Sequence, residues 1–132
     1  YKLGEDIRRR GGKIPGNENE LRDSGFIGLY VTNAFELFIL RNRKPLLDVN
    51  MSRLLKRYFK PGDFIDVRHD KEIQELANDI IEVRRCKELN WAILDYAALV
   101  CKTRNPLCGE CVLNKHCKYY ELSQGDVTEE PE

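Results

Sequence analysis

Hydrophobic residues recur along this chain every three to four positions, and glycine and proline separate the segments in which they do so. This spacing is typical of amphipathic helices, because about 3.6 residues complete one helical turn. No run alternates between polar and apolar residues for long enough to predict a strand. We therefore expect an all-α fold, with helices over residues 3–10, 17–24, 29–40, 50–59, 71–84 and 87–101.

Two of these expected helices carry an apolar stripe along one face. An apolar face lowers the free energy of the folded state only when other elements cover it, so we expect both stripes to be core rather than cofactor contacts. The stripes consist of Ile73, Leu76, Ala77, Ile80 and Ile81 in the first helix, and of Trp91, Leu94, Ala97 and Ala98 in the second.

Helix boundaries in the first third of the chain are marked by residues with known end preferences. Gly11-Gly12 is expected to end the first helix, whose basic last turn suits the negative end of the helix dipole. Asn17, followed three residues later by Glu20, resembles a capping box that opens the second helix. The connection Gly25-Phe26-Ile27-Gly28 then leads into a third, apolar helix that must end before Pro45. The result is a helix, a tight connection and a helix.

The charges balance in number but not in position. The chain holds 22 basic and 22 acidic residues, and the basic ones concentrate in the first half. Basic runs alone are most often solvated helix faces, so they indicate a nucleic-acid partner only together with other features. The carboxyl-terminal residues are acidic and lack apolar periodicity, and we expect 122–132 to form a disordered acidic tail.

The composition, 42% hydrophobic and 33% charged, is that of an ordinary globular protein. No apolar run approaches the roughly 20 residues that a bilayer span requires, and the first residues do not resemble a secretory leader. We therefore expect no membrane association and a cytosolic, non-secreted protein.

Cysteine spacing is the strongest chemical feature of the sequence. Cys101, Cys108, Cys111 and Cys117 follow the pattern C-x6-C-x2-C-x5-C, which lets four thiolates converge on one tetrahedral or cubane centre. In a reducing compartment such thiols are more often metal ligands than disulfides. Spacing alone does not separate zinc from iron. Cys86 lies outside the pattern and is expected to be a small buried side chain.

Three stretches of the chain together resemble one known family. They are Asn90-Trp-Ala-Ile-Leu-Asp-Tyr-Ala-Ala-Leu-Val-Cys101 with the cysteine loop that follows it, the connection and helix over 25–34, and Leu47-Asp48-Val49-Asn50-Met-Ser-Arg53-Leu54. This set is similar to the helix-hairpin-helix DNA glycosylase superfamily, which includes endonuclease III and adenine mismatch glycosylase. The family's hairpin usually has the sequence Leu-Pro-Gly-Val-Gly, so the segment 24–28 departs from it by one displaced glycine.

The resemblance implies the carboxyl-terminal part of a helix-hairpin-helix glycosylase fold with a 4Fe-4S cluster on the four spaced cysteines. It assigns residues 1–46 to the remainder of a six-helix barrel that includes the hairpin, and residues 47–121 to a helical cluster domain. The family's earlier barrel helices have no counterpart in this sequence. We therefore expect the chain to be a fragment, or to be completed by a second chain or by a missing amino-terminal segment.

Asp48 occupies the position of the family's catalytic aspartate, in the pattern Asp-x-Asn-x-x-Arg. Breaking the bond between base and sugar develops positive charge on the sugar ring, which a nearby carboxylate stabilises. An aspartate just before a helix is, in isolation, more often an N-cap. Both roles are compatible, because a helix amino terminus favours the ionised carboxylate.

The resemblance also implies contacts to double-stranded DNA that carries a mismatched or damaged base. Backbone N–H groups at the hairpin would hold one phosphate without reading the sequence, and cations in the cysteine loop would add phosphate contacts. Such a protein would act in the nucleoid or the nucleus. The predicted DNA-binding residues are Gly25, Phe26, Ile27, Gly28, Lys102 and Arg104.

Tyr30 narrows the reaction that the resemblance implies. In this family a lysine at the corresponding position forms a Schiff base with the sugar and permits strand cleavage, whereas a thymine-mismatch branch has tyrosine. A phenol cannot form that imine. We therefore expect a monofunctional glycosylase that releases thymine or uracil mispaired with guanine, after flipping the base into a pocket.

Two alternatives remain at this point. One is an adenine glycosylase that acts opposite oxidised guanine, although such proteins commonly carry a further recognition domain after the cluster. The other is a non-catalytic four-cysteine zinc module that binds DNA, in which Asp48 is merely a helix cap.

Overall fold

The chain is helical throughout the residues that the computed structural model describes, namely 2–23, 28–62 and 66–125, and no strand occurs among them. The expected all-α class is confirmed. Two short 3-10 helices lie between the last two α-helices. The elements are α1 (Lys2–Arg9), α2 (Glu18–Asp23), α3 (Leu29–Phe38), α4 (Val49–Phe59), α5 (Lys71–Ile80), α6 (Cys86–Leu99), η1 (Cys108–Glu110), η2 (Asn114–His116) and α7 (Lys118–Gly125).

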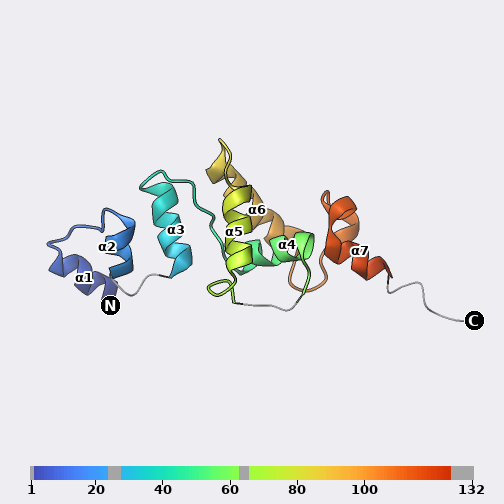
Figure 1. Cartoon of the computed structure of the whole chain (residues 1–132), viewed down its shortest axis with the longest axis horizontal. Helices are drawn as coiled ribbons and strands as arrows, with labels where there is room; N and C mark the ends of the chain where they lie inside the picture. Colours follow the sequence, from blue (N-terminus) through green and yellow to red (C-terminus); the bar gives the residue numbers. More distant parts are fainter. Residues whose placement is uncertain (1, 24–27, 63–65, 126–132) are drawn as a thin grey trace, which may run out of the picture.

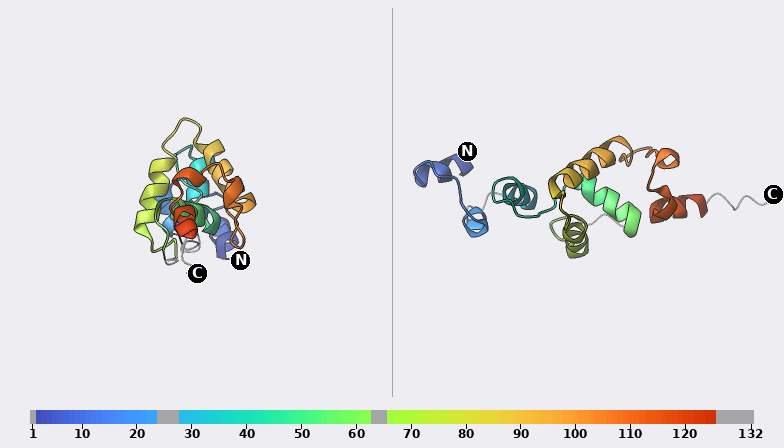
Figure 2. Two further views of the ribbon diagram at one scale, coloured as in Figure 1. Left: turned by 90° about the vertical axis from the view of Figure 1, so that its right-hand side faces the viewer. Right: turned by 90° about the horizontal axis from the view of Figure 1, so that it is seen from above.

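The helices are strung along one long axis (Figure 1). Helices α1 and α2 lie at one end, α3 follows, α4, α5 and α6 form the middle, and α7 lies at the other end, an order that the view from above repeats (Figure 2). Helix α4 is the centre of the packing, because it contacts α5, α6 and α7. None of the helices in the described part of the chain is long and apolar enough to span a membrane.

Local capping interactions explain where the first helices begin and end. Gly11 and Gly12 have positive φ angles of 67° and 81°, and the Gly12 N–H donates to the Ile7 carbonyl at 2.9 Å, so this glycine pair ends α1 as expected. The Glu20 N–H donates to Asn17 Oδ1 at 3.0 Å, which confirms the predicted cap of α2.

Two apolar clusters form the core. The larger joins α4 to α5 and α6, and the smaller joins α3 and the segment after it to Ile81 and to the start of α6. Leu94 of α6 packs against both clusters and so links them. Cys86 is buried in the smaller cluster, as expected. The buried members are Leu47, Met51, Leu54, Leu55, Ile73, Ala77 and Ala97 in the larger cluster, and Leu37, Leu46, Ile81 and Cys86 in the smaller.

The predicted stripe of α5 is confirmed, but the stripe of α6 is only partly correct. Ala97 is fully buried, whereas Ala98 is exposed and Trp91 is 48% exposed. Helix α6 is rotated so that Asn90 and Ala97 point into the core, and Trp91 stands about 100° around the helix from Asn90. Its indole stacks on the Phe38 ring of α3, with ring centroids 6.0 Å apart.

Three predicted boundaries are also wrong. Helix α5 ends at Ile80, not at residue 84, because the chain turns there and places Ile81 in the smaller core cluster. Helix α3 ends at Phe38, short of residue 40, and the following Arg41 has a φ angle of 63°. Residues 122–125 belong to α7 rather than to a disordered tail, since the Ser123 hydroxyl bonds to the Tyr120 carbonyl within that helix. Residues 126–132 lie outside the described residues.

Candidate active site and metal centre

The four spaced cysteines lie in the loop that connects α6 to α7, on the side of α4 that carries its arginines. Cys101 follows the end of α6, Cys108 begins η1, Cys111 follows η1, and Cys117 precedes α7. Two tight turns hold the last three cysteines, because the N–H of Cys111 donates to the Cys108 carbonyl and that of Cys117 to the Asn114 carbonyl. All four thiols are free and partly buried.

The four sulfurs share one electrostatic neighbourhood. Burial raises the pKa of the Cys108 thiol, and the charges of Cys117, Cys101 and Cys111 raise it further. Thiolates crowded in this way repel one another, and bound cations would offset that repulsion. Four soft sulfur donors are the ligand set that zinc and iron-sulfur centres use, so the chemistry of the residues present fits a metal group.

The sulfur positions do not form a tight single-ion cage. In the described part of the chain, no three or more His, Cys, Asp or Glu side chains are grouped so as to hold a metal ion. Four thiolates on one zinc ion, each about 2.3 Å from it, lie about 3.8 Å apart. In a 4Fe-4S cluster each cysteine binds a different iron, which spaces the sulfurs more widely.

Asp48 caps helix α4. Its Oδ1 accepts hydrogen bonds from the backbone N–H groups of Asn50 at 2.9 Å and Met51 at 2.8 Å, and its Oδ2 accepts one from Asn50 Nδ2 at 3.0 Å. The side chain is half-buried. The aspartate is thus an N-cap, and it also presents a fixed negative charge at the protein surface.

A hydrogen-bonded path links Asp48 to the first cysteine of the loop. Asn50, whose amide donates to Asp48, accepts a bond from Arg53 Nη2 at 3.0 Å through its Oδ1. Arg53 in turn donates from Nε to the Cys101 carbonyl at 2.8 Å and from Nη2 to the Ala97 carbonyl at 2.8 Å. The three polar positions of the pattern Asp-x-Asn-x-x-Arg therefore form one physical unit that joins the start of α4 to the end of α6.

Two buried asparagines fix the segment that leads into Asp48. The amide of Asn90 on α6 accepts the Leu46 N–H at 2.6 Å and donates to the Lys44 carbonyl at 3.2 Å. Asn33 on α3 donates to the Pro45 carbonyl at 2.9 Å, and this contact is buried. Residues 44–46 are thereby clamped between α3 and α6, and the clamp determines how α3 stands relative to Asp48.

Tyr30 lies in the first turn of α3 and is 42% exposed. It precedes Asn33 by three residues, which places the two side chains on neighbouring parts of one helix face. Since Asn33 is bonded to the segment that ends at Asp48, the clamp also restrains the position of Tyr30. The phenol remains accessible from solvent.

The predicted DNA-binding residues are only partly described. Gly25, Phe26 and Ile27 lie outside the described residues. Gly28 is exposed and is the N-cap of α3, and no side chain caps the helix there. Its φ angle is −75°, and a Cβ at this position would meet no atom of the described residues within 4 Å.

The cations of the cysteine loop are exposed, whereas many of those in the first half are occupied within the chain. Lys102 and Arg104 are solvent-exposed, and neither forms an ion pair with the described residues. Less of the positive charge in the first half of the chain is therefore available to bind phosphates than the sequence indicates. The pairs that occupy it are Arg9 and Arg10 with Asp6, Arg43 with Glu82, Lys56 with Asp70, and Lys60 with Glu72.

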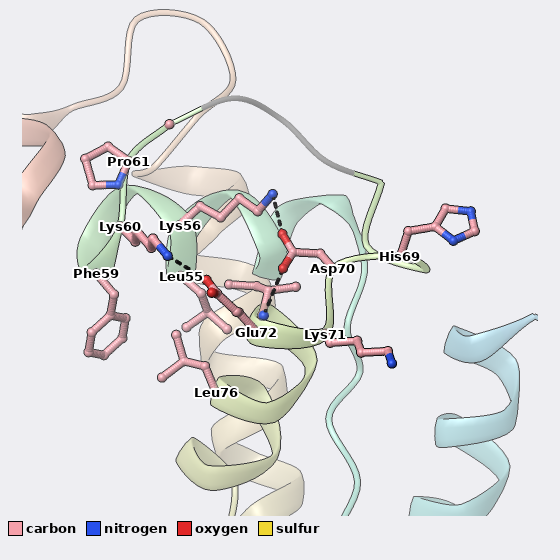
Figure 3. Close-up of a pocket in the computed structure, with 12 residues that line it drawn as sticks. Leu55, Lys56, Phe59, Lys60, Pro61, His69, Asp70, Lys71, Glu72 and Leu76 are labelled. Atoms are coloured by element: carbon pink, nitrogen blue, oxygen red, sulfur yellow. Dashed lines mark hydrogen bonds and ion pairs between the residues drawn. The ribbon is translucent and has the colours of Figure 1, made fainter.

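Two cavities flank the carboxyl-terminal half of α4, and neither is lined by Asp48 or Tyr30. One, of about 550 Å³, lies between the end of α4 and the start of α5, and its rim carries the ion pairs Lys56–Asp70 and Lys60–Glu72 (Figure 3). The other, of about 520 Å³, lies beside the cysteine loop, and Arg53, Lys56, Arg57, Thr103 and Tyr119 are among the residues that line it.

Sequence reasoning missed two residues that contact the cysteines. Arg57 donates from Nη1 to Cys101 Sγ at 3.5 Å, and the Tyr96 hydroxyl donates to Cys111 Sγ at 3.3 Å. Periodicity places Arg57 on the face of α4 that Arg53 also occupies, which is a local signal. Nothing local connects Tyr96 to Cys111, because the two are joined only through the fold of the loop. The fourth cysteine, Cys117, bonds as a thiol to the Arg57 carbonyl at 3.5 Å, a contact that a thiolate ligand cannot donate.

No family model matches the chain. It is 30% identical over 116 residues to the thymine/uracil-DNA glycosylase of Methanothermobacter thermautotrophicus, a match that covers 87% of this chain and 52% of that protein. It is 35% identical over 115 residues to the thymine-DNA glycosylase of Aeropyrum pernix, covering 85% of this chain and 52% of that protein. Endonuclease III and adenine DNA glycosylases are also similar to it.

Among solved structures, a thermostable thymine-DNA glycosylase matches 92% of this chain and 56% of its own, with a TM-score of 0.80 and 28% sequence identity. The chain therefore spans about half the length of the relatives that it matches.

Proposed function

Because the chain is a homologue of the thymine/uracil-DNA glycosylases of the helix-hairpin-helix superfamily, we propose that the whole protein is a base-excision repair glycosylase that hydrolyses the bond between base and sugar. The observation that carries this proposal is the geometry of Asp48. Its carboxyl group is held by three hydrogen bonds at a helix amino terminus, and it is still half-exposed.

The reaction needs one negative charge in a fixed place. As the base departs, positive charge develops on the sugar, and the Asp48 carboxylate stabilises it and orients the attacking water. The charge is preorganised, because the backbone of Asn50 and Met51 and the side chain of Asn50 already hold the carboxylate. Arg53 holds Asn50 in turn, so Asn50 and Arg53 are positioning residues.

Tyr30 defines the type of reaction. Its phenol cannot form a Schiff base, so the enzyme releases the base and does not cut the strand through a covalent imine at this position. The tyrosine is accessible and restrained through the Asn33 clamp, which suits a residue that contacts a flipped base. The substrate that we propose is thymine or uracil mispaired with guanine, because a mismatch lowers the cost of flipping.

The four cysteines Cys101, Cys108, Cys111 and Cys117 are the proposed ligands of a 4Fe-4S cluster. When bound, the cluster supplies structural cross-linking of the loop rather than a step of the hydrolysis. The place of four free, partly buried thiols in one loop supports this assignment. In the proposed organisation, residues 47–121 form the cluster domain and residues 1–46 contribute to a barrel that a further protein segment completes.

The DNA contacts that we propose lie in the cysteine loop and at the amino terminus of α3. Exposed Lys102 and Arg104 bind phosphates from the cysteine loop, and the residues 25–28 bind a phosphate at the start of α3. The N-cap of α3 supports the second contact, since Gly28 has no side chain with which to cap the first N–H groups of the helix. Double-stranded DNA in the nucleoid or nucleus is therefore the proposed partner.

A panel of defined duplexes tests the proposal with the full-length protein. We expect release of the pyrimidine from G:T and G:U duplexes, with strand breaks that appear only after alkali, and no release from matched DNA. Release of adenine opposite oxidised guanine, or no release from any duplex, would contradict it. Iron and sulfide contents of the anaerobically purified protein test the cofactor separately, and zinc in place of iron would refute the cluster.

A further inference from the structure

We infer that Arg57 and Tyr96 donate hydrogen bonds to two cluster sulfurs and thereby set how firmly the cluster is held and at what potential it is reduced. This inference rests on the cluster that we propose above, and it concerns residues to which the motifs give no role. The two donors come from different helices, Arg57 from α4 and Tyr96 from α6, and they reach different cysteines.

The direction of the tyrosine bond follows from its neighbours. The backbone N–H of Val112 donates to the Tyr96 hydroxyl oxygen at 2.9 Å, so the hydroxyl proton is left to point toward Cys111 Sγ, 3.3 Å away. The sulfur therefore accepts, whether it is a thiol or a ligand thiolate. One hydroxyl thus joins α6 to the turn around Cys111 by two hydrogen bonds.

Arg57 can only donate, and it makes several bonds to the same turn. Besides Cys101 Sγ at 3.5 Å, its Nη1 donates to the Lys102 carbonyl at 2.6 Å, and its Nη2 donates to the Thr103 carbonyl at 3.2 Å. The guanidinium also lies over the Tyr119 ring, 4.7 Å from its centroid. These contacts fix a positive charge beside the first cysteine sulfur.

Hydrogen bonds to ligand sulfurs draw electron density from the metal centre. They stabilise the more reduced, more negative cluster and so raise its reduction potential, and groups that orient the ligands slow loss of the metal. Arg57 and Tyr96 should act on both quantities. Neither contacts Asp48 or Tyr30 in the described residues, which separates this role from the hydrolysis of the base.

The decisive variant is Tyr96→Phe, which keeps the ring and removes the one oxygen that bonds to Cys111 Sγ and the Val112 N–H. Tyr119→Phe is the matched control, because it removes a hydroxyl next to the same loop that makes no bond to a cysteine sulfur in the described structure. Arg57→Lys keeps the charge but cannot span the Lys102 and Thr103 carbonyls and the sulfur together.

The measurements use the full-length protein purified without air. They are iron per chain, the rate of iron loss to a ferrous chelator, and the reduction potential at an electrode that supplies the electron. We expect Tyr96→Phe to lose iron faster, on the order of tenfold as for other groups that orient metal ligands, and to be reduced at a more negative potential. Arg57→Lys should change both quantities in the same direction, and Tyr119→Phe should match the wild type.

Equal iron loss and equal potential in Tyr96→Phe and wild type would overturn the inference while leaving the cluster in place. A wild-type protein without iron would instead refute the proposed cofactor, and with it this inference, before any variant is compared. The two failures are therefore distinguishable from the wild-type iron content alone.

Discussion

Replacing Asp48 by asparagine removes one charge and disturbs one of three hydrogen bonds. The asparagine Oδ1 can keep both bonds from the backbone of Asn50 and Met51, because asparagine caps helices about as well as aspartate. In the wild type the amide nitrogen of Asn50 donates to Asp48 Oδ2. In the variant it would face the amide nitrogen of the asparagine at 48, and two donors would then oppose each other. Asn50 cannot simply turn over, since its oxygen already accepts from Arg53.

The stability cost follows from these contacts. Loss of one hydrogen bond to a charged group costs about 1.5 kcal/mol, and loss of the charge at the helix amino terminus costs about 0.5 kcal/mol more. A domain with about 5 kcal/mol of stability would keep about 3 kcal/mol and remain more than about 99% folded. Unfolding therefore cannot account for a large loss of activity.

The catalytic cost should be larger. A preorganised charge opposite a cationic transition state contributes about 3 kcal/mol, so Asp48→Asn should slow base release at least about a hundredfold. The assay is single-turnover excision from a G:T or G:U duplex with the full-length protein, beside a binding titration in which affinity for the mismatch should hold. An excision rate close to that of the wild type would remove Asp48 from the mechanism.

A second substitution separates charge from structure. In the double variant Asp48→Asn with Asn50→Asp, the amide at 48 donates to the carboxylate at 50, and that carboxylate accepts from Arg53. Every hydrogen bond again joins a donor to an acceptor, although the bond between the side chains at 48 and 50 now runs in the opposite direction. The net charge is unchanged, but the carboxylate now pairs with the arginine. We expect stability to return while excision stays slow. Recovery of the excision rate in this variant would refute the electrostatic argument.

Three further predictions concern other residues. Arg104→Ala should weaken binding to matched and mismatched duplexes alike and lower the salt slope by about one, since the side chain is exposed and would bind a phosphate; a loss confined to mismatched DNA would argue against that contact. Tyr30→Lys should yield a covalent adduct that borohydride traps, because it supplies an amine that can form an imine with the sugar; absence of any adduct would place residue 30 away from the sugar. The hydrogen bond from Lys56 holds the pKa of Asp70 in the folded protein below its usual range. The ionised Asp70 therefore stabilises the fold fully above about pH 4, and this stabilisation is lost as the pH falls through the lowered pKa of the folded state. Asp70→Asn can still cap α5, and it should lower the free energy of unfolding by about 1–2 kcal/mol at neutral pH. In acid the variant should lose less unfolding free energy than the wild type. An acid profile equal to that of the wild type would contradict the pairing of Asp70 with Lys56.

The sequence predicted the helices and several of their ends because those depend on neighbouring residues. The glycine pair after α1, the Asn17 cap of α2 and the burial of Cys86 are confirmed. The predicted ends of α3 and α5 are wrong, because distant packing determines them. Ile81 leaves the helix to join a core formed with Leu37 of α3, which no local pattern reveals.

The same distinction applies to the candidate site. The spacing of the cysteines and the pattern around Asp48 were sufficient to name candidate residues, and the cap geometry of Asp48 follows from its place before a helix. These features depend on residues within a few positions of one another. The sequence by itself therefore named the candidate residues, but not Arg57 and Tyr96, which contact two of the cysteine sulfurs.

Only the tertiary structure decided how that inventory is connected. Arg53 reaches Cys101 across 48 positions, and Asn90 holds the Leu46 N–H across 44. Such contacts depend on the rotation and approach of whole helices, which the balance of all core contacts determines together. The face of α6 that turns inward is decided in the same way, and it places Tyr96 beside Cys111 and Trp91 at the surface.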